Sequence, residues 1–267
     1  MIKAIALDMD NTLLNNQKQI SAVNKKALKE LHEQGVKIIL CSGRPYKGLK
    51  PYLVELELLN PGDVCICFNG GLVETSKDQT KIASHTLTKS QLAGLYEAAR
   101  SNQFPLDLVA ENHVYSLVEL GKSSYEERLG KLISFENTNF ADVPEDEVFY
   151  KAIMLKDLTT AQFASELIKQ SGNFHVTGSY PEMLEILPPD INKAVGLKAA
   201  LKYFDLKPSE LVAFGDEAND QEMLEFAGIG VAMGNATAKL KAVANEITLS
   251  NVEDGVAVFL QKISDQF

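Results

Sequence analysis

The chain has 267 residues, of which 45% are hydrophobic and 23% charged, a balance typical of a soluble globular protein. That length suits one large domain or two ordinary ones. The formal net charge of −10 argues against nucleic acid and anionic membrane surfaces as partners. An acidic protein that handles an anionic substrate needs local compensation from placed cations, helix N-termini or a bound metal ion.

The first apolar segment follows the initial Met-Ile-Lys directly, and no apolar run approaches the roughly 18 residues of a membrane span. We therefore expect a cytoplasmic protein without a signal peptide. Cys41, Cys65 and Cys67 all lie in apolar runs, and the last two lack the two-residue spacer of a zinc or redox pair. We interpret these cysteines as small buried residues in a reducing compartment.

The first third of the chain alternates strand and helix patterns. Residues 3–8 form a predicted buried strand, and Ser21 is a good N-cap for an amphipathic helix that runs to about Gln34. Two further apolar strands are predicted at residues 36–41 and 64–68. This alternation predicts parallel βαβ units.

The middle of the chain, from about Ser84 to Leu187, mixes the two patterns less regularly, and a hairpin is predicted around Glu111-Asn112. This composition predicts an α+β domain inserted into the first one. The candidate helices are residues 89–102, 122–130 and 159–171, and the candidate strands are residues 106–110, 113–116, 149–155, 174–178 and 183–186.

From Asn192 the strand–helix rhythm returns, with a helix at residues 193–204 and a strand at 211–214. The predicted organisation is thus an α/β core with a parallel sheet, residues 1–83 and 188–267, that is split by an α+β domain, residues 84–187. Pro188-Pro189 stiffens the second crossing.

Asp8 and Asp10 lie where the first predicted strand ends. Side chains two residues apart on an extended strand point to the same side, so both carboxylates would face one direction. Two close carboxylates repel each other, and a metal cation or a proton must compensate. The alternative is a strand that simply ends in the Asx turn of Asn11-Thr12.

A second acidic segment, Gly215-Asp216-Glu217-Ala218-Asn219-Asp220, also follows an apolar strand. Asp216 and Asp220 would join Asp8 and Asp10 at the carboxyl ends of two strands of one sheet. Four carboxylates make a hard, oxygen-rich site that suits Mg²⁺. The alternative is a loop whose aspartates cap a helix.

Two further segments can bind an anion. Ser42-Gly43 offers a hydroxyl and a backbone N–H at a helix N-terminus. Lys193 begins a helix, where a cation is unfavourable for the helix dipole, unless it faces a bound anion. The alternatives are an ordinary Ser-Gly turn and a solvated surface lysine.

Together these residues supply what phosphoryl transfer needs: a nucleophile, charge neutralisation around phosphorus and a proton donor. Aspartate can act as the nucleophile by forming an aspartyl-phosphate. In this hypothesis one aspartate attacks, the second carries the proton, and lysine and serine hold the phosphate oxygens.

The four segments around Asp8, Ser42, Lys193 and Asp216 resemble the four motifs of the haloacid dehalogenase superfamily. Their order and spacing resemble the Cof-type sugar-phosphatase branch, with a Rossmann-like three-layer core and a large, type IIB-like α+β cap between the second and third motifs. Further matches to this branch are Phe68-Asn69-Gly70-Gly71, Glu222-Met223-Leu224, Val231-Ala232-Met233-Gly234-Asn235-Ala236 and Glu253-Asp254-Gly255-Val256.

The resemblance implies a role for each matching residue. Asp8 would be the nucleophile, and Asp10 the general acid and base, with its backbone carbonyl on the metal. The implied phosphate-binding residues are Ser42, Gly43, Lys193 and Asn219, and the implied metal-site residues are Asp8, Asp10, Asp216 and Asp220, the last acting indirectly. One departure is Asn11, where the family often has glycine; asparagine tolerates the same backbone angles.

The leading hypothesis is a Mg²⁺-dependent phosphatase acting on small phosphorylated metabolites such as sugar phosphates. A phosphomutase of the same fold and a non-catalytic binding or regulatory protein are the alternatives. A monomer or small homo-oligomer is expected. Arg44 could reach the substrate or form a salt bridge beside the site.

Overall fold

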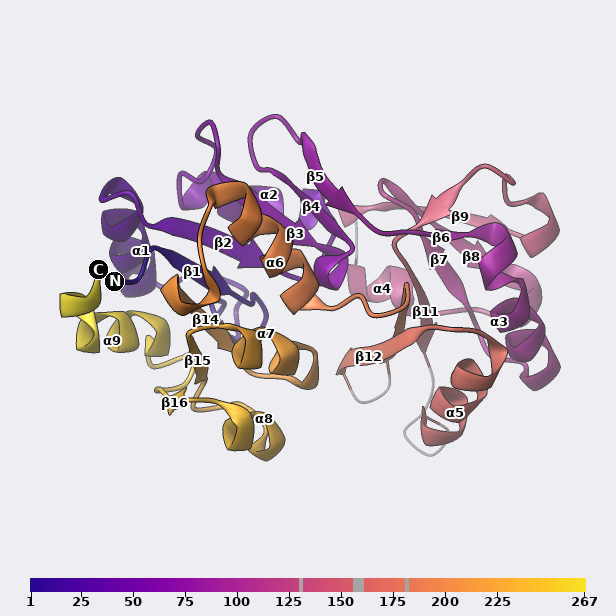
Figure 1. Cartoon of the computed structure of the whole chain (residues 1–267). Coiled ribbons are helices and arrows are strands. Elements are labelled where there is room, and N and C mark those ends of the chain that lie inside the picture. Colours follow the sequence, from indigo (N-terminus) through magenta and orange to yellow (C-terminus); the bar gives the residue numbers. More distant parts are fainter. Residues whose placement is uncertain (130–131, 156–160, 181–182) are drawn as a thin grey trace. The chain divides into compact units, whose positions relative to one another are not determined.

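The structure is a computed structural model that describes residues 1–129, 132–155, 161–180 and 183–267 (Figure 1). The chain divides into two compact units. The core unit comprises Met1–Ala83 and Asn192–Phe267, and the inserted unit comprises Ser84–Ile191. The second break follows Ile191, beyond the predicted Leu187–Pro188 junction.

The described part of the core unit is built on one eight-stranded sheet in the order β16-β15-β14-β1-β2-β3-β4-β5 (Figure 1). The strands from β16 to β3 run parallel, whereas β4 returns antiparallel to β3. The antiparallel edge strand β4 was not predicted from the sequence. The bounds are β1 (Ala4–Leu7), β2 (Lys37–Cys41), β3 (Val64–Cys67), β4 (Leu72–Thr75), β5 (Lys81–Ser84), β14 (Leu211–Gly215), β15 (Ile229–Ala232) and β16 (Glu246–Ile247).

Helices cover both faces of this sheet (Figure 1). On one face α1 contacts α9, and on the other α6 contacts α7, which confirms the predicted three-layer α/β arrangement. Side-chain caps define the starts of two helices, because Ser21 accepts from the Asn24 N–H and Asn192 from the Val195 N–H. The bounds are α1 (Ala22–Glu33), α2 (Tyr46–Glu55), α6 (Lys193–Phe204), α7 (Gln221–Phe226), α8 (Ala238–Val243) and α9 (Gly255–Lys262).

The described residues of the inserted unit form a six-stranded sheet, ordered β12-β13-β11-β7-β8-β9, and a short β6–β10 pair. The hairpin predicted around Glu111-Asn112 is confirmed as β7–β8. Strand β9 was not predicted, and the predicted helix ends at Gly130 and Thr159 lie outside the described residues. The bounds are β6 (Leu87–Thr88), α3 (Lys89–Asn102), β7 (Asp107–Val109), β8 (His113–Leu117), α4 (Tyr125–Leu129), β9 (Ser134–Thr138), β10 (Val148–Phe149), β11 (Lys151–Leu155), α5 (Ala161–Ser171), β12 (His175–Tyr180) and β13 (Met183–Leu187).

The two faces of the inserted sheet differ in chemistry. One face packs its apolar side chains, such as Leu108 and Ile186, against α3 and α5. The opposite face carries a buried ion pair, in which the Lys151 Nζ lies 2.5 Å from Glu185 Oε2. Strand alternation explains this segregation, since residues 151 and 153 share a face and Glu185 lies opposite Ile153. No described helix of either unit combines the length and apolar character that a membrane crossing requires.

Candidate active site

Lys193 lies at the centre of a buried cluster of charges at the carboxyl ends of the core strands. Its ammonium group donates to Asp8 Oδ1 and, at 2.6 Å, to Asp220 Oδ1. Asp8 directly follows β1, Lys193 begins α6, and Asp220 ends the 3₁₀ turn η6 (Ala218–Asp220). The side chain of Lys193 is 0% exposed, so the alternative of a solvated surface lysine is wrong.

Asp216 completes this cluster. Candidate ligand oxygens of Asp8, Asp216 and Asp220 lie within 4.8 Å of one another. Asp216 Oδ1 accepts a hydrogen bond of 2.8 Å from Thr12 Oγ1. Asp220 Oδ2 accepts from the backbone N–H groups of Asp216 and Glu217, at 2.9 and 3.1 Å. Because protein donors hold both oxygens of Asp220, Asp8 and Asp216 are better placed to contact a cation.

Gly215 allows the acidic loop to fold back on itself. A Cβ atom at this position would lie 2.4 Å from Asp220 Cβ and 2.6 Å from its Cγ, closer than any real contact. The glycine therefore permits the Asp220 carboxylate to reach both Lys193 and the backbone N–H groups.

The cluster carries more negative than positive groups. Burial raises the pKa of Asp8 to about 7 although Lys193 opposes the shift, and burial together with the charges of Asp8 and Asp220 raises the pKa of Asp216 to about 8. For Lys193, burial acts to lower the pKa, but Asp220 and Asp8 outweigh it and raise the value. A set of carboxylate oxygens that one lysine does not neutralise fits a hard divalent cation.

Asp10 lies in a different environment from Asp8. Arg44 Nη2 donates to its Oδ1 at 2.8 Å and Lys18 Nζ at 2.6 Å. Burial acts to raise the pKa of Asp10, but Arg44 and Lys18 lower it overall. The three-carboxylate cluster does not include Asp10. Of the two roles considered for Arg44, the described contacts show the salt bridge.

Asn11 follows Asp10 in the left-handed region, with φ of 60°. Asparagine tolerates this left-handed conformation, as expected at a position where the family often has glycine. The backbone oxygen of Asn11 accepts a hydrogen bond of 2.8 Å from Asn235 Nδ2. The loop after β1 is thus tied to the segment after β15.

Asn69 connects the predicted anion-binding residues. Its backbone N–H donates to the Ser42 carbonyl at 2.9 Å, and its Oδ1 accepts from Asn219 Nδ2 at 3.2 Å. A Cβ atom on Gly43 would lie 3.1 Å from the same Oδ1. Ser42, Gly43 and Asn219 therefore converge on one buried amide.

Sequence reasoning assigned no role to Asn69 or Thr12, although both lie in segments that carried the family resemblance. Each is a polar residue that lies shortly after a predicted apolar strand, and this position is the signal that could have indicated its role. Asn69 adopts a left-handed φ of 54° in η1 (Phe68–Gly70), directly after β3. Thr12 lies in the turn after β1 and is 0% exposed.

A family model for haloacid dehalogenase-like hydrolases matches residues 5–260. The chain belongs to this family. It is 32% identical over 270 residues to YitU of Bacillus subtilis (strain 168), named a 5-amino-6-(5-phospho-D-ribitylamino)uracil phosphatase, and the match covers 97% of this chain and 96% of YitU. The resemblance proposed from the motifs is confirmed.

Solved structures of the family share the whole fold. A haloacid dehalogenase-like hydrolase from Bacteroides thetaiotaomicron is 33% identical, with a TM-score of 0.84 over 98% of this chain and 100% of that chain. The subclass IIB sugar phosphatase BT4131 is 22% identical, with a TM-score of 0.85 over 98% and 99%. The second likeness concerns the fold alone and agrees with the type IIB arrangement expected from the motif spacing.

Proposed function

We propose that this haloacid dehalogenase family member is a Mg²⁺-dependent phosphatase that hydrolyses phosphate monoesters of small metabolites such as sugar phosphates. The observation that carries the proposal is the buried contact of Asp8 with Lys193, with Asp216 and Asp220 beside them. A carboxylate held by a buried lysine at a strand end is positioned as a nucleophile. The phosphatase named among the relatives supports the same reaction.

The first half-reaction transfers the phosphoryl group to Asp8. Lys193 holds Oδ1 of Asp8, and the second oxygen attacks phosphorus as the bond from phosphorus to the ester oxygen breaks. Asp10 must take up a proton before this step, against the Arg44 and Lys18 contacts that lower its pKa, and that proton then passes to the leaving oxygen. Ser42, Gly43 and Asn219 donate to the phosphate oxygens and hold phosphorus in line with the attack.

The second half-reaction hydrolyses the aspartyl-phosphate. Asp10, now ionised, accepts a proton from a water molecule, whose oxygen attacks phosphorus. The bond from phosphorus to the Asp8 oxygen breaks and inorganic phosphate leaves. The Arg44 and Lys18 contacts suit this step, because they stabilise the ionised form of Asp10.

The carboxylate cluster would hold the metal ion. Asp8 and Asp216 are the proposed side-chain ligands, the Asp10 backbone carbonyl is a third, and Asp220 positions them through Lys193 and the loop backbone. When bound, Mg²⁺ neutralises phosphate charge and favours the attack of one anion on another.

We further propose that the inserted unit acts as a cap that selects the substrate. We also propose that the protein is a cytoplasmic monomer or small homo-oligomer. Three free, buried cysteines agree with a reducing compartment. Exchange of the inserted unit for that of a relative should change which phosphate esters are hydrolysed fastest.

The deciding experiment compares Asp8→Asn with Asp265→Asn, a matched change at an exposed position. With Mg²⁺ and p-nitrophenyl phosphate, Asp8→Asn should lose at least about 10³-fold in kcat, whereas the control should retain activity. Circular dichroism verifies folding. Unchanged turnover in Asp8→Asn would contradict the mechanism. In a second assay with a hexose phosphate as the substrate, an isomerised product with little released phosphate would instead identify a mutase.

A further inference from the structure

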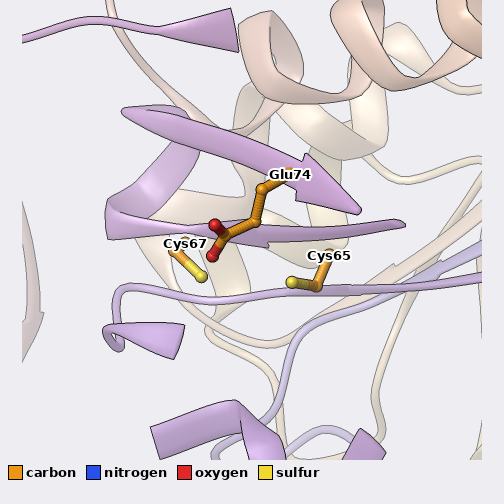
Figure 2. A group of neighbouring side chains, drawn as sticks. All are labelled: Cys65, Cys67 and Glu74. Atoms are coloured by element: carbon orange, nitrogen blue, oxygen red, sulfur yellow. The ribbon is translucent and has the colours of Figure 1, made fainter. Parts of the chain in front are cut away.

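A second cluster of metal-binding side chains lies in the hairpin formed by β3 and β4 (Figure 2). Cys65 pairs directly with Glu74 across these antiparallel strands, and Cys67 lies two residues further along β3. Alternation along a strand places residues 65 and 67 on one face, beside the Glu74 side chain. Figure 2 shows the two thiols and the carboxylate directed toward one another.

The geometry of this cluster is close to that of a coordination site. One candidate ligand atom from each residue lies within 4.8 Å of the other two, and the three residues are 0%, 0% and 1% exposed. In a tetrahedral zinc site, bond lengths of about 2.0 to 2.3 Å place neighbouring ligand atoms roughly 3.3 to 3.8 Å apart. Small side-chain rotations would therefore bring the three ligands to coordination distance without moving either strand.

The chemistry of the ligands separates this cluster from the candidate active site. Asp8, Asp216 and Asp220 offer oxygen alone, which suits Mg²⁺. Two sulfur ligands with one carboxylate suit a borderline-soft cation instead. The spacing Cys65-Ile-Cys67 did not indicate a metal site in the sequence, because the third ligand comes from the neighbouring strand.

We propose that Cys65, Cys67 and Glu74 form a binding site for Zn²⁺ or a cation of the same thiophilic class, with water as the fourth ligand. Binding converts both thiols to thiolates, and their protons pass to the solvent. The metal would link β3 to β4, the two strands that flank Asn69. Asn69 is the residue that contacts Ser42 and Asn219. The site would therefore stabilise the hairpin that positions part of the phosphate-binding region.

Cobalt provides the direct test, because thiolate ligands give Co²⁺ an intense near-ultraviolet charge-transfer band. The reduced full-length protein is titrated with Co²⁺ in excess Mg²⁺, which occupies the oxygen-rich site. We expect the thiolate band to appear in the wild type and to disappear when Zn²⁺ is added. Cys67→Ser should lose the band, whereas Cys41→Ser, a change at another buried cysteine outside the cluster, should retain it.

A wild-type measurement covers the case in which Cys67→Ser does not fold. Zinc-edge X-ray absorption of the zinc-loaded wild type, again in excess Mg²⁺, should show two sulfur neighbours, and Zn²⁺ should raise its Tm. A folded wild type that binds no thiophilic cation, or that shows only oxygen and nitrogen neighbours, would overturn the proposal. A cobalt band that persists in folded Cys67→Ser would do the same.

Discussion

Each unit of the molecule buries a lysine against a carboxylate, but the two arrangements differ in their charge balance. In the core unit, Lys193 contacts Asp8 and Asp220, and Asp216 lies beside them. In the inserted unit, Lys151 of β11 contacts Glu185 of the neighbouring strand β13, with side-chain exposures of 4% and 1%. Both lysines are therefore dehydrated, and each depends on its acidic neighbours to remain charged.

The pKa values of the buried groups reflect this difference in charge balance between the two units. Burial acts to lower the pKa of Lys151, but Glu185 and Tyr125 outweigh it and raise the value, as in a satisfied pair. In the core, burial together with the neighbouring carboxylates raises the pKa of Asp8 to about 7 and that of Asp216 to about 8. The balanced charges of the first pair agree with a role in the fold, whereas the unbalanced cluster agrees with the proposed binding of a cation and a phosphate.

The largest expected effect is that of Lys193→Met on catalysis. This change removes the group that holds Asp8 and that would neutralise phosphate charge in the proposed mechanism, so kcat/KM should fall about 10³-fold, or about 4 kcal/mol in transition-state stabilisation. Steady-state assays with Mg²⁺, alongside circular dichroism, measure the loss. Wild-type kinetics in a folded Lys193→Met variant would contradict the claim that Lys193, unlike Lys151, serves catalysis.

Lys151→Met should act on stability instead. It leaves Glu185 buried without its lysine, and the free energy of unfolding should fall by about 3 to 5 kcal/mol. The double variant Lys151→Met/Glu185→Leu should recover much of that loss, since it removes both charges together. Urea unfolding measures both values. A single variant as stable as the wild type would show that the pair does not support the fold.

Thr12→Val tests the support of the unbalanced cluster. Valine keeps the shape of threonine but removes the hydroxyl that donates to Asp216 Oδ1. Loss of such a partner to a proposed metal ligand should weaken Mg²⁺ binding about 10- to 100-fold. Activity measured against Mg²⁺ concentration reports the change. An unaltered Mg²⁺ dependence would argue against Asp216 as a ligand.

The smallest effect concerns pH. Asp216 has a folded-state pKa of about 8 against an ordinary value of 3.8, so the metal-free folded protein holds a proton that the unfolded chain releases between these values. Its stability should therefore fall as pH rises from about 4 to 8. In EDTA at pH 8.5, Asp216→Asn should be more stable than the wild type by at least about 1 kcal/mol, the equivalent of one pKa unit.

Urea unfolding at pH 5 provides the control for Asp216→Asn, because Asp216 of the folded, metal-free wild type is then protonated and as neutral as the amide that replaces it. The difference in stability between them should be smaller there than at pH 8.5. A variant that is destabilised equally at the two pH values would indicate that the Asp216 charge does not strain the metal-free site.

The core strands could be predicted because they are continuous apolar runs with clear ends. Residues 64–68 predicted β3 within one residue, but nothing in Asn69-Gly70-Gly71 predicted a second strand directly after it. The chain instead turns through Asn69 in a left-handed conformation and returns as β4. Strand β9 escaped prediction because Ser134–Thr138 has few apolar residues and pairs at an edge.

The candidate site was partly predictable for a similar reason. Motifs near strand ends indicated which residues belong to it, but not which of them touch. The contact of Lys193 with Asp8, the hydrogen bond from Thr12 to Asp216 and the link through Asn69 depend on strand order and loop geometry. The Cys65, Cys67 and Glu74 cluster depends in the same way on the register of β3 and β4.

The position of β1 in the core sheet has a consequence for synthesis on the ribosome. This strand lies between β2 and β14, so one of its edges has no partner until Leu211–Gly215 has been translated. The inserted unit is one continuous stretch and is complete earlier. Nascent chains should therefore fold the inserted unit first while an apolar strand edge stays open to chaperones or to neighbouring chains on the same messenger.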